Sequence, residues 1–248
     1  MRGILKDMAL ALQFLTRVPI RFRGLDPARL SRASAWFPAV GVLVGGVAAG
    51  VYILVAPHLG KPLAALASVL AMILITGGLH DDGLADCADA FGGGWTCEDR
   101  LRILKDSRIG SFGALALIVS IAGRVLLLAN LPADTAIKYL ISASVIARWT
   151  PLPLGAILKP VRGPEGQGRR IADGMSWRTV VFGTVMAIGI VVLFLRASAW
   201  QPIVAVVILT ALSGMYYQRR LGGITGDCMG ATIQISEIAV YICGAWIR

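Results

Sequence analysis

Four aspartates fall within nine positions of the segment TGGLHDDGLADCADAFGGG, residues 76–94. If this segment is helical, at about 100° per residue, the side chains of Asp82, Asp86 and Asp89 lie within roughly 60° of one another and Asp81 points away. Three carboxylates on one face repel each other unless a cation lies among them. Magnesium prefers hard oxygen ligands, often a few carboxylates together with substrate phosphates. The spacing therefore predicts a Mg²⁺ site at Asp82, Asp86 and Asp89.

A basic segment, RLRILKDSRIGSFGALAL (100–117), follows after three glycines, residues 92–94, that are expected to end the helix. Lys105 and Arg108 are placed to face phosphate, and Ser107 is a candidate cap that leaves the amides of the next helix free for an anion. Taken alone, these charges equally fit residues that flank a membrane span. Beside the aspartates they favour a phosphate clamp, in which a hydroxyl attacks a metal-bound diphosphate and a nucleoside monophosphate leaves.

Two further segments favour an anionic ligand. KPVRGPEGQGRRIADG, residues 159–174, is basic and rich in glycine and proline, as expected of a flexible cover over such a ligand. RRLGGITGDCMGA, residues 219–231, places Asp227 at the start of the last apolar run. The chain has no Walker A sequence and no GxGxxG motif after a strand, which disfavours an ATPase or a dinucleotide-binding fold. Its four cysteines form no CxxC pair, so neither zinc nor a disulfide is indicated.

The elements that must position these residues are predicted to be membrane-spanning helices. Hydrophobic residues make up 56% of the 248 residues and charged residues only 15%, which is too apolar for a soluble domain. We expect an all-α polytopic membrane protein that forms a single domain over residues 1–248. Residues 1–24 are typical of an amphipathic interfacial helix, with a short re-entrant or core helix as the alternative. Hydropathy predicts about seven spans, at residues 36–56, 62–79, 111–130, 135–158, 178–197, 201–217 and 229–247.

The distribution of charge predicts how these spans are oriented. Eighteen of the 24 lysines and arginines fall in the N-terminal segment or in the loops 80–110, 159–178 and 218–228, against four on the opposite side. This asymmetry predicts that the N-terminus and the three basic loops are cytoplasmic. The net charge of +10 then indicates contact with anionic lipid rather than nucleic acid. Seven of the 14 acids share loop 80–110, and their spacing argues against a merely solvated acidic helix end.

One acid, Glu237, lies inside a predicted span. It is about 12 Å from the cytoplasmic end at 1.5 Å per residue, while Arg148 is about 15 Å in and Arg124 about 20 Å in. An ionised group inside a bilayer usually has a partner, so the matching depths predict an ion pair between Glu237 and Arg148. The alternative is a neutral Glu237, or one that lines the substrate cavity as a polar ligand.

Several of these segments resemble the cobalamin synthase family. The resemblance spans nearly the whole chain and is carried by FLTRVPI (14–20), WFPAVG (36–41), GGLHDDGLADCAD (77–89), KDSRIGSFG (105–113) and GGITGDCMGATIQISE (222–237). It implies a magnesium-dependent enzyme of the inner membrane that completes the nucleotide loop of vitamin B12. Such an enzyme joins adenosylcobinamide-GDP to α-ribazole or α-ribazole 5′-phosphate, and forms adenosylcobalamin or its 5′-phosphate together with GMP.

The resemblance also completes the set of candidate site residues. Metal binding is assigned to Asp82, Asp86 and Asp89, catalysis to Asp86, Asp89, Lys105 and Arg108, and substrate binding to His80, Asp106, Ser107, Asp227 and Glu237. Asp89 is the first choice as acceptor of the proton from the attacking ribose hydroxyl. Asp81 departs from the family pattern. It lies off the shared face, so we expect its loss to be mild, and its role is unexplained.

Two rival functions are weighed against this one. CDP-alcohol phosphotransferases also carry an acidic Asp-Gly motif on a membrane helix, but their signature has Ala-Arg where this chain has DGLADCAD without arginine. An ion-coupled transporter would use Arg124, Arg148 and Glu237 as a charge relay, but would place its acids at mid-bilayer. The sequence leaves open whether the riboside is phosphorylated, and whether the protein forms a homo-oligomer or associates with other enzymes of the pathway.

Overall fold

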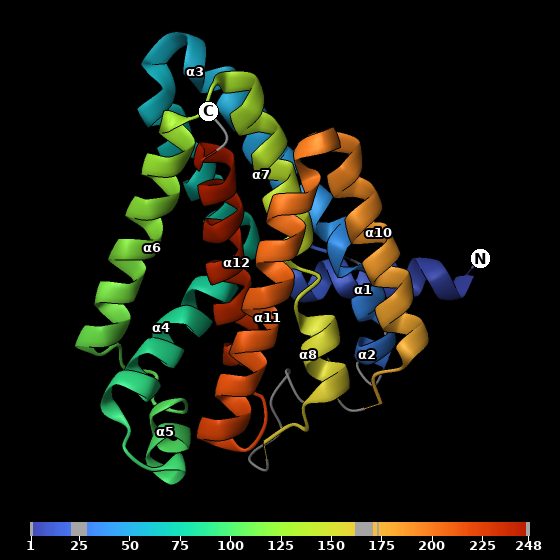
Figure 1. Cartoon of the computed structure of the whole chain (residues 1–248), viewed down its shortest axis with the longest axis vertical. Helices are drawn as coiled ribbons and strands as arrows, with labels where there is room; N and C mark the ends of the chain where they lie inside the picture. Colours follow the sequence, from blue (N-terminus) through green and yellow to red (C-terminus); the bar gives the residue numbers. More distant parts are fainter. Residues whose placement is uncertain (1, 21–28, 162–170, 173, 247–248) are drawn as a thin grey trace.

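The computed structural model describes residues 2–20, 29–161, 171–172 and 174–246, and this part of the chain is helical, which confirms the all-α class (Figure 1). Extended backbone pairs within it at an isolated bridge between Pro160 and Ile224. The helices are α1 (Arg2–Leu15), α2 (Leu30–Ala33), α3 (Phe37–Thr76), α4 (Leu79–Gly93), α5 (Cys97–Ile103), α6 (Ser111–Asn130), α7 (Ala133–Ala147), α8 (Pro151–Ile157), α10 (Trp177–Leu195), α11 (Trp200–Leu221) and α12 (Gly226–Trp246).

Five stretches of the described residues are long and apolar enough to cross a membrane: Leu30–Thr76, Ser111–Asn130, Ala133–Ile157, Trp177–Leu221 and Gly226–Trp246. The first and fourth, of 47 and 45 residues, are too long for one crossing and fold back on themselves. In α3 the chain turns at Gly60, and Ser68 Oγ donates a hydrogen bond to the carbonyl of Ala48 at 2.9 Å. A straight helix would hold those two residues about 30 Å apart.

The second reversal is a 3₁₀ turn at Arg196–Ala199, where Arg196 has a φ of 52°. The seven predicted spans therefore correspond to helical arms of the structure. In Figure 1, α5 and the loop joining α11 to α12 lie at the lower end, while both reversals and the C-terminus lie at the upper end. Two of the basic loops, 80–110 and 218–228, thus lie at the same end of the molecule, as the charge pattern predicts.

Two predicted spans are broken. The helix that was expected to run past His80 ends at Thr76, because Gly77 and Gly78 adopt left-handed conformations with φ of 66° and 71°. This glycine pair caps α3 and lets α4 leave in a new direction. The predicted span 135–158 is interrupted between α7 and α8, where Pro151 cannot continue the hydrogen bonding of the preceding turn.

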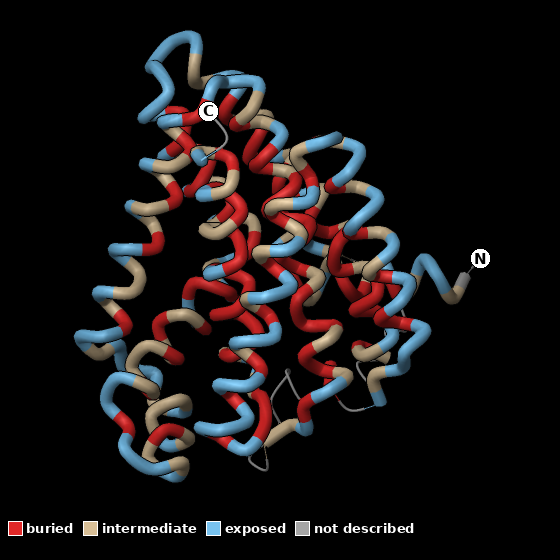
Figure 2. The backbone as a smooth tube through the Cα atoms, in the orientation of Figure 1, coloured by how far each residue is buried: buried red, intermediate tan, exposed pale blue. Residues whose placement is uncertain are grey.

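The buried side chains gather around α12, which packs against α4, α6, α7 and α11 (Figure 2). Small residues allow these close approaches. A Cβ added at Gly45 of α3 would lie 2.6 Å from the Cα of Ile141 on α7, for example. On the outer side of α6 the large apolar side chains Leu115, Ile118 and Val119 are exposed. An apolar exterior of this kind suits contact with lipid.

Candidate active site

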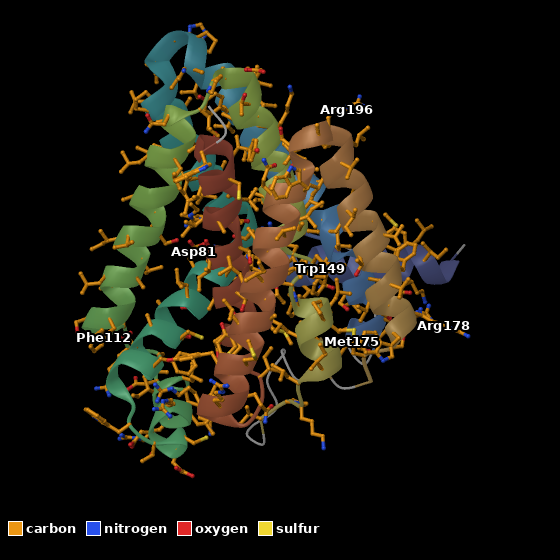
Figure 3. All side chains as sticks on the ribbon, in the orientation of Figure 1. Asp81, Phe112, Trp149, Met175, Arg178 and Arg196 are labelled. Atoms are coloured by element: carbon orange, nitrogen blue, oxygen red, sulfur yellow. The ribbon has the colours of Figure 1, made fainter. Side chains whose placement is uncertain are left out.

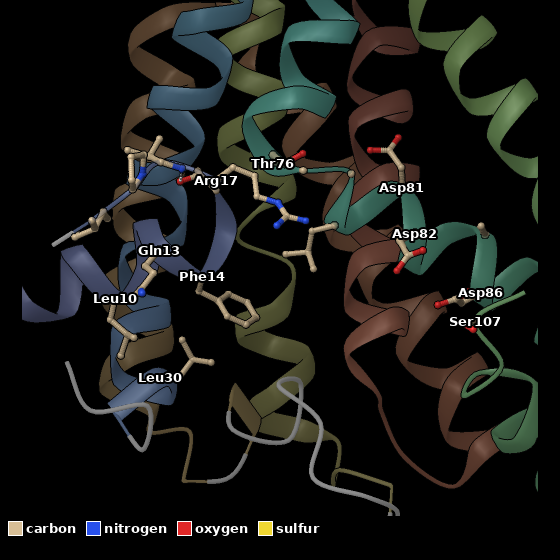
Figure 4. A pocket seen from close by; sticks show the side chains of 18 of the residues that line it. Leu10, Gln13, Phe14, Arg17, Leu30, Thr76, Asp81, Asp82, Asp86 and Ser107 are labelled. Carbon is tan, nitrogen blue, oxygen red and sulfur yellow. Dashed lines mark hydrogen bonds between the residues drawn. The ribbon is translucent and has the colours of Figure 1, made fainter. Parts of the chain in front are cut away.

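A cleft of about 1130 Å³ lies beside α4 (Figure 4). Asp82 and Asp86 lie on its α4 side, and residues from 10 to 20 of α1 and the following segment lie opposite. The turn between α3 and α4 connects these two sides, and Ser107 contributes from the loop before α6. The cleft therefore brings together residues that lie far apart in the chain.

The carboxylates of this cleft are crowded. Asp227, at the start of α12, lies close to the α4 acids because Gly83 lets the two helices touch. A Cβ on Gly83 would be 2.8 Å from the carbonyl oxygen of Asp227. Burial, and then the charges of Asp82, Asp227 and Asp89, raise the pKa of Asp86 to about 7. The structure thus places Asp227, which was predicted to bind substrate, close to Asp82 and Asp86, two of the predicted metal ligands.

This acidic set fits a divalent cation only in part. Among the described residues, no three Asp, Glu, His or Cys side chains are grouped so that they would hold a metal ion by themselves. The metal site predicted at Asp82, Asp86 and Asp89 stays a prediction. The donors nevertheless suit Mg²⁺, which completes its coordination with waters and substrate phosphates. Burial, and then the charges of the neighbouring carboxylates, raise the pKa of Asp86, and a cation would relieve the repulsion between these carboxylates.

Asp89 has a different task from the predicted one. Its two carboxylate oxygens accept hydrogen bonds from the backbone amides of Gly110 and Gly113, at 2.7 and 2.8 Å. It therefore caps α6, which begins at Ser111, and the expectations that Ser107 is the cap and that these amides await an anion are wrong. A carboxylate with both oxygens engaged is also poorly placed to accept a substrate proton, which corrects the choice of Asp89 as the base.

The predicted phosphate clamp is not assembled. The Arg108 guanidinium binds Asp106, with 2.7 Å between Nη2 and Oδ2, and the Arg108 backbone amide donates to the same carboxylate. These bonds lower the pKa of Asp106 to about 2, and the charge of Arg108 is thus already balanced by Asp106. Lys105, Asp106 and Arg108 do not line the cleft, whereas Ser107 lies beside Asp86 (Figure 4).

A buried charge network lies behind the cleft. Arg148 Nη1 is 3.1 Å from Glu237 Oε1, which confirms the predicted ion pair. Arg124 also belongs to the network: its Nη1 is 3.7 Å from Glu237 Oε2, and its Nη2 binds Asp81. Asp81, which lies in the interior between α6 and α12 (Figure 3), therefore offsets the second arginine. The network contains two acids and two arginines, so their formal charges cancel.

His80 and Glu237 do not line the cleft in the described structure, and their role in binding substrate stays a prediction. His80 is buried where α4 crosses α12: its Cα would lie 3.4 Å from a Cβ on Gly230. Burial, and then the charges of Arg148 and Arg124, hold the pKa of His80 well below its usual value, so the ring is neutral. Along α4, Asp82 and Asp86 face the cleft while His80 faces α12.

The predicted cover, residues 159–174, falls largely outside the described residues, which omit 162–170 and 173. Arg17 was not predicted as a site residue, yet its side chain lines the cleft opposite the α4 acids (Figure 4). The signal was present in the segment FLTRVPI, residues 14–20, where arginine interrupts an apolar run.

Together, the fold and the cleft define a polytopic helical membrane protein with an acidic site on one side of a short helix. The chain belongs to the cobalamin synthase family, because the sequence model of the family described as Cobalamin-5-phosphate synthase matches residues 7–245.

Curated relatives carry the name adenosylcobinamide-GDP ribazoletransferase. One from Ralstonia pickettii (strain 12J) is 38% identical, over 93% of this chain and 91% of its own length. One from Ralstonia nicotianae (strain ATCC BAA-1114 / GMI1000) is 36% identical, over 99% of this chain and 97% of its own. A third, from Shewanella sp. (strain W3-18-1), is 37% identical over 94% of this chain and 90% of its own. No solved structure is significantly similar.

Proposed function

We propose that this protein is an adenosylcobinamide-GDP ribazoletransferase, which joins adenosylcobinamide-GDP to α-ribazole or its 5′-phosphate and releases GMP. The observation that carries the proposal is the acidic cleft, which Asp82 and Asp86 line and near which Asp227 lies, in a chain of the cobalamin synthase family. In this reaction the ribose 3′-hydroxyl attacks the phosphorus on the cobinamide side of the diphosphate. The bond from that phosphorus to the bridging oxygen breaks, and GMP leaves with that oxygen.

Mg²⁺ is the cofactor that the carboxylates of this cleft support. Asp82 and Asp86 would hold it, with Asp227 beside them, and substrate phosphates would complete its shell. When bound, the ion neutralises charge on the phosphate oxygens. Asp89 supports this arrangement indirectly, because its hydrogen bonds to Gly110 and Gly113 fix α4 against α6.

Asp86 takes over the proton-accepting role first assigned to Asp89. Its carboxylate lines the cleft, where the attacking hydroxyl of the substrate would reach it. Ser107 lies beside it and offers a hydroxyl for hydrogen bonding to substrate (Figure 4). Lys105 is an exposed cation of the loop between α5 and α6 and does not line the cleft.

We further propose that the protein lies in the inner membrane with its N-terminus and the acidic cleft on the cytoplasmic side. The support is the concentration of lysine and arginine in the N-terminal segment and three loops, two of which join helices at the lower end in Figure 1. A cytoplasmic cleft meets nucleotide-activated substrates where they are made in the cell.

The function is tested with protein purified in detergent. Adenosylcobinamide-GDP is supplied with α-ribazole or with its 5′-phosphate, with Mg²⁺ or with excess EDTA, and GMP and the corrinoid product are quantified. We expect GMP and product in equal amounts, and only with Mg²⁺. A reaction of CDP-activated lipid with a free alcohol, in the absence of any product from adenosylcobinamide-GDP, would instead establish the rival phosphotransferase.

A further inference from the structure

Arg17 is the one basic residue among those lining the cleft in the described structure. The carboxylates on the same lining are Asp81, Asp82 and Asp86. Asp81 is already paired with Arg124, which leaves Asp82 and Asp86 on the side of the cleft facing Arg17. A ligand that binds both sides of the cleft needs oxyanions for Arg17 and a cation for Asp82 and Asp86. A metal-bound phosphate carries both.

The structure fixes the backbone of Arg17. Its amide donates a hydrogen bond to the carbonyl of Ile75 in the last turn of α3, at 2.7 Å. On the preceding residue, the Thr16 hydroxyl donates to the carbonyl of Leu12 at 2.7 Å and accepts from the amide of Val18 at 3.3 Å. The segment that follows α1 is therefore tied both to α1 and to the end of α3.

The side chain of Arg17 occupies the place that a side chain at position 77 would need. A Cβ on Gly77 would lie 2.8 Å from Cγ and 2.9 Å from Cδ of Arg17, and closer still to its Nε. Glycine at this turn therefore serves two purposes, since its φ of 66° is also left-handed. With its stem held in this way, Arg17 projects into the cleft toward Asp82 (Figure 4).

The guanidinium is exposed, and Arg17 forms no ion pair with a carboxylate of the described residues. It also lies next to the carboxyl end of α3, whose dipole favours a cation. By contrast, Arg108 is held by Asp106, and Arg124 and Arg148 are held by the network around Glu237. Arg17 is thus the arginine of the cleft that is available to a ligand.

We infer that Arg17 is the phosphate-binding cation of this cleft, which binds substrate phosphate oxygens from the side opposite the acids. Arginine suits this task because its planar fork binds two phosphate oxygens at once. The inference rests on the proposed function for the identity of the substrates. Two sources offer this chemistry: the diphosphate of adenosylcobinamide-GDP and the phosphate of α-ribazole 5′-phosphate.

The test compares wild type, Arg17→Gln, Arg17→Lys and the matched control Arg178→Gln, which changes an exposed arginine of α10 that does not line the cleft. KM is measured for adenosylcobinamide-GDP and for both forms of the riboside. Loss of a charge-assisted hydrogen bond predicts a KM increase of roughly 10- to 100-fold in Arg17→Gln. Arg17→Lys should recover part of this loss, because it keeps the charge but not the fork, and Arg178→Gln should match wild type.

The substrates distinguish the two sources. If Arg17 binds the diphosphate, KM for adenosylcobinamide-GDP rises with either riboside. If it binds the riboside phosphate, KM rises for α-ribazole 5′-phosphate and not for α-ribazole. Binding of GDP, measured by calorimetry in the same detergent, gives a readout that needs no turnover, and we expect it to weaken roughly tenfold in Arg17→Gln if the diphosphate is the ligand.

The outcomes separate this inference from the proposed function. An active wild type with unchanged KM values and unchanged GDP binding in Arg17→Gln would overturn the role of Arg17 and leave the function intact. A wild type that releases no GMP but binds GDP in an Arg17-dependent manner would overturn the function and keep the role of Arg17. An inactive wild type that does not bind GDP would overturn both.

Discussion

Asp81 and Asp86 lie five residues apart on α4 and meet different surroundings. Asp81 is buried and binds Arg124, and through Arg124 it belongs to the network around Glu237. Asp86 is half-buried, and this burial, together with the charges of the neighbouring carboxylates, raises its pKa to about 7. A substitution of either aspartate by asparagine removes one charge at nearly constant shape, so the two variants separate a site function from a structural one.

Asp86→Asn should lower kcat/KM for GMP release by about 100-fold or more, which is the range that loss of an acid–base group or a metal ligand produces. Its melting temperature should equal or exceed that of wild type at neutral pH, because the variant removes a carboxylate that its neighbours destabilise. Activity and thermal unfolding are measured in the same detergent. A clear loss of stability would show that Asp86 is a structural residue.

Asp81→Asn should show the opposite behaviour. It leaves Arg124 buried with only the more distant Glu237, and breaking a buried pair costs about 3–5 kcal/mol of unfolding free energy. The structure thus corrects the expectation that this change is mild, although the activity of each folded molecule should survive. The measurement is thermal unfolding together with GMP release normalised to folded protein. Wild-type stability in Asp81→Asn would contradict the role given to the network.

At the scale of elements, α4 is the helix that positions the site, and two contacts fix it. Asp89 fastens it to the start of α6 through Gly110 and Gly113. Gly83 fits it against α12 at Asp227. The acids therefore lie on a helix that is held on two sides. Substitutions at these contacts should change activity by shifting the position of the acids.

Asp89→Asn tests the first contact. Asparagine keeps one acceptor oxygen for the amides at the start of α6, so the expected loss is about 1 kcal/mol of unfolding free energy, the usual cost of a weakened helix cap. GMP release should stay within about tenfold of wild type, since Asp89 is assigned no role in binding the metal or the proton. If Asp89→Asn were as stable as wild type but as inactive as Asp86→Asn, Asp89 would be a ligand or a base after all.

Gly83→Ala tests the second contact, with Gly123→Ala as the control. A Cβ at Gly83 meets the backbone of Asp227 at 2.8 Å, whereas a Cβ at Gly123 of α6 meets nothing within 4 Å. The first change must push α4 and α12 apart, at a cost of about 1–3 kcal/mol for overpacking, and should also lower activity. The control should be neutral or slightly stabilising, because alanine favours helix. Equal effects of the two changes on thermal unfolding would refute the close contact.

At the scale of the whole molecule, connecting loops of the helices lie at two opposite ends (Figure 1). The loop after α4 lies at the lower end, and the start of α7 lies at the upper end. Lysine and arginine are concentrated in the N-terminal segment and the loops 80–110, 159–178 and 218–228. On the positive-inside rule, we propose that the lower end is cytoplasmic.

Cysteine labelling in intact cells tests this orientation in a cysteine-free background. A cysteine at Trp95, which is 90% exposed in the loop after α4, should be shielded from an impermeant reagent added outside. A cysteine at Asp134, in the first turn of α7, should react. Both positions should react after the cells are permeabilised. The reversed pattern would place the cleft outside the cytoplasm and contradict the proposed orientation.

The sequence alone determined the class, the helices and the family of this protein. Apolar runs long enough to cross a membrane leave the backbone no alternative to helix, because lipid offers no hydrogen bonds. Helical spacing places Asp82 and Asp86 on one face, and the cost of a lone buried charge predicts that Glu237 pairs with Arg148. These features follow from local periodicity and from single-residue energetics.

Only the tertiary structure decided which of these surfaces meet. The left-handed pair Gly77 and Gly78 redirects α4, so that its acids face Arg17 across a cleft. The same packing engages Asp89 as a helix cap and brings Asp227 to the acids. None of these contacts follows from hydropathy or spacing, because a hydrophobic pattern tells a helix which face to bury but not which backbone it will touch.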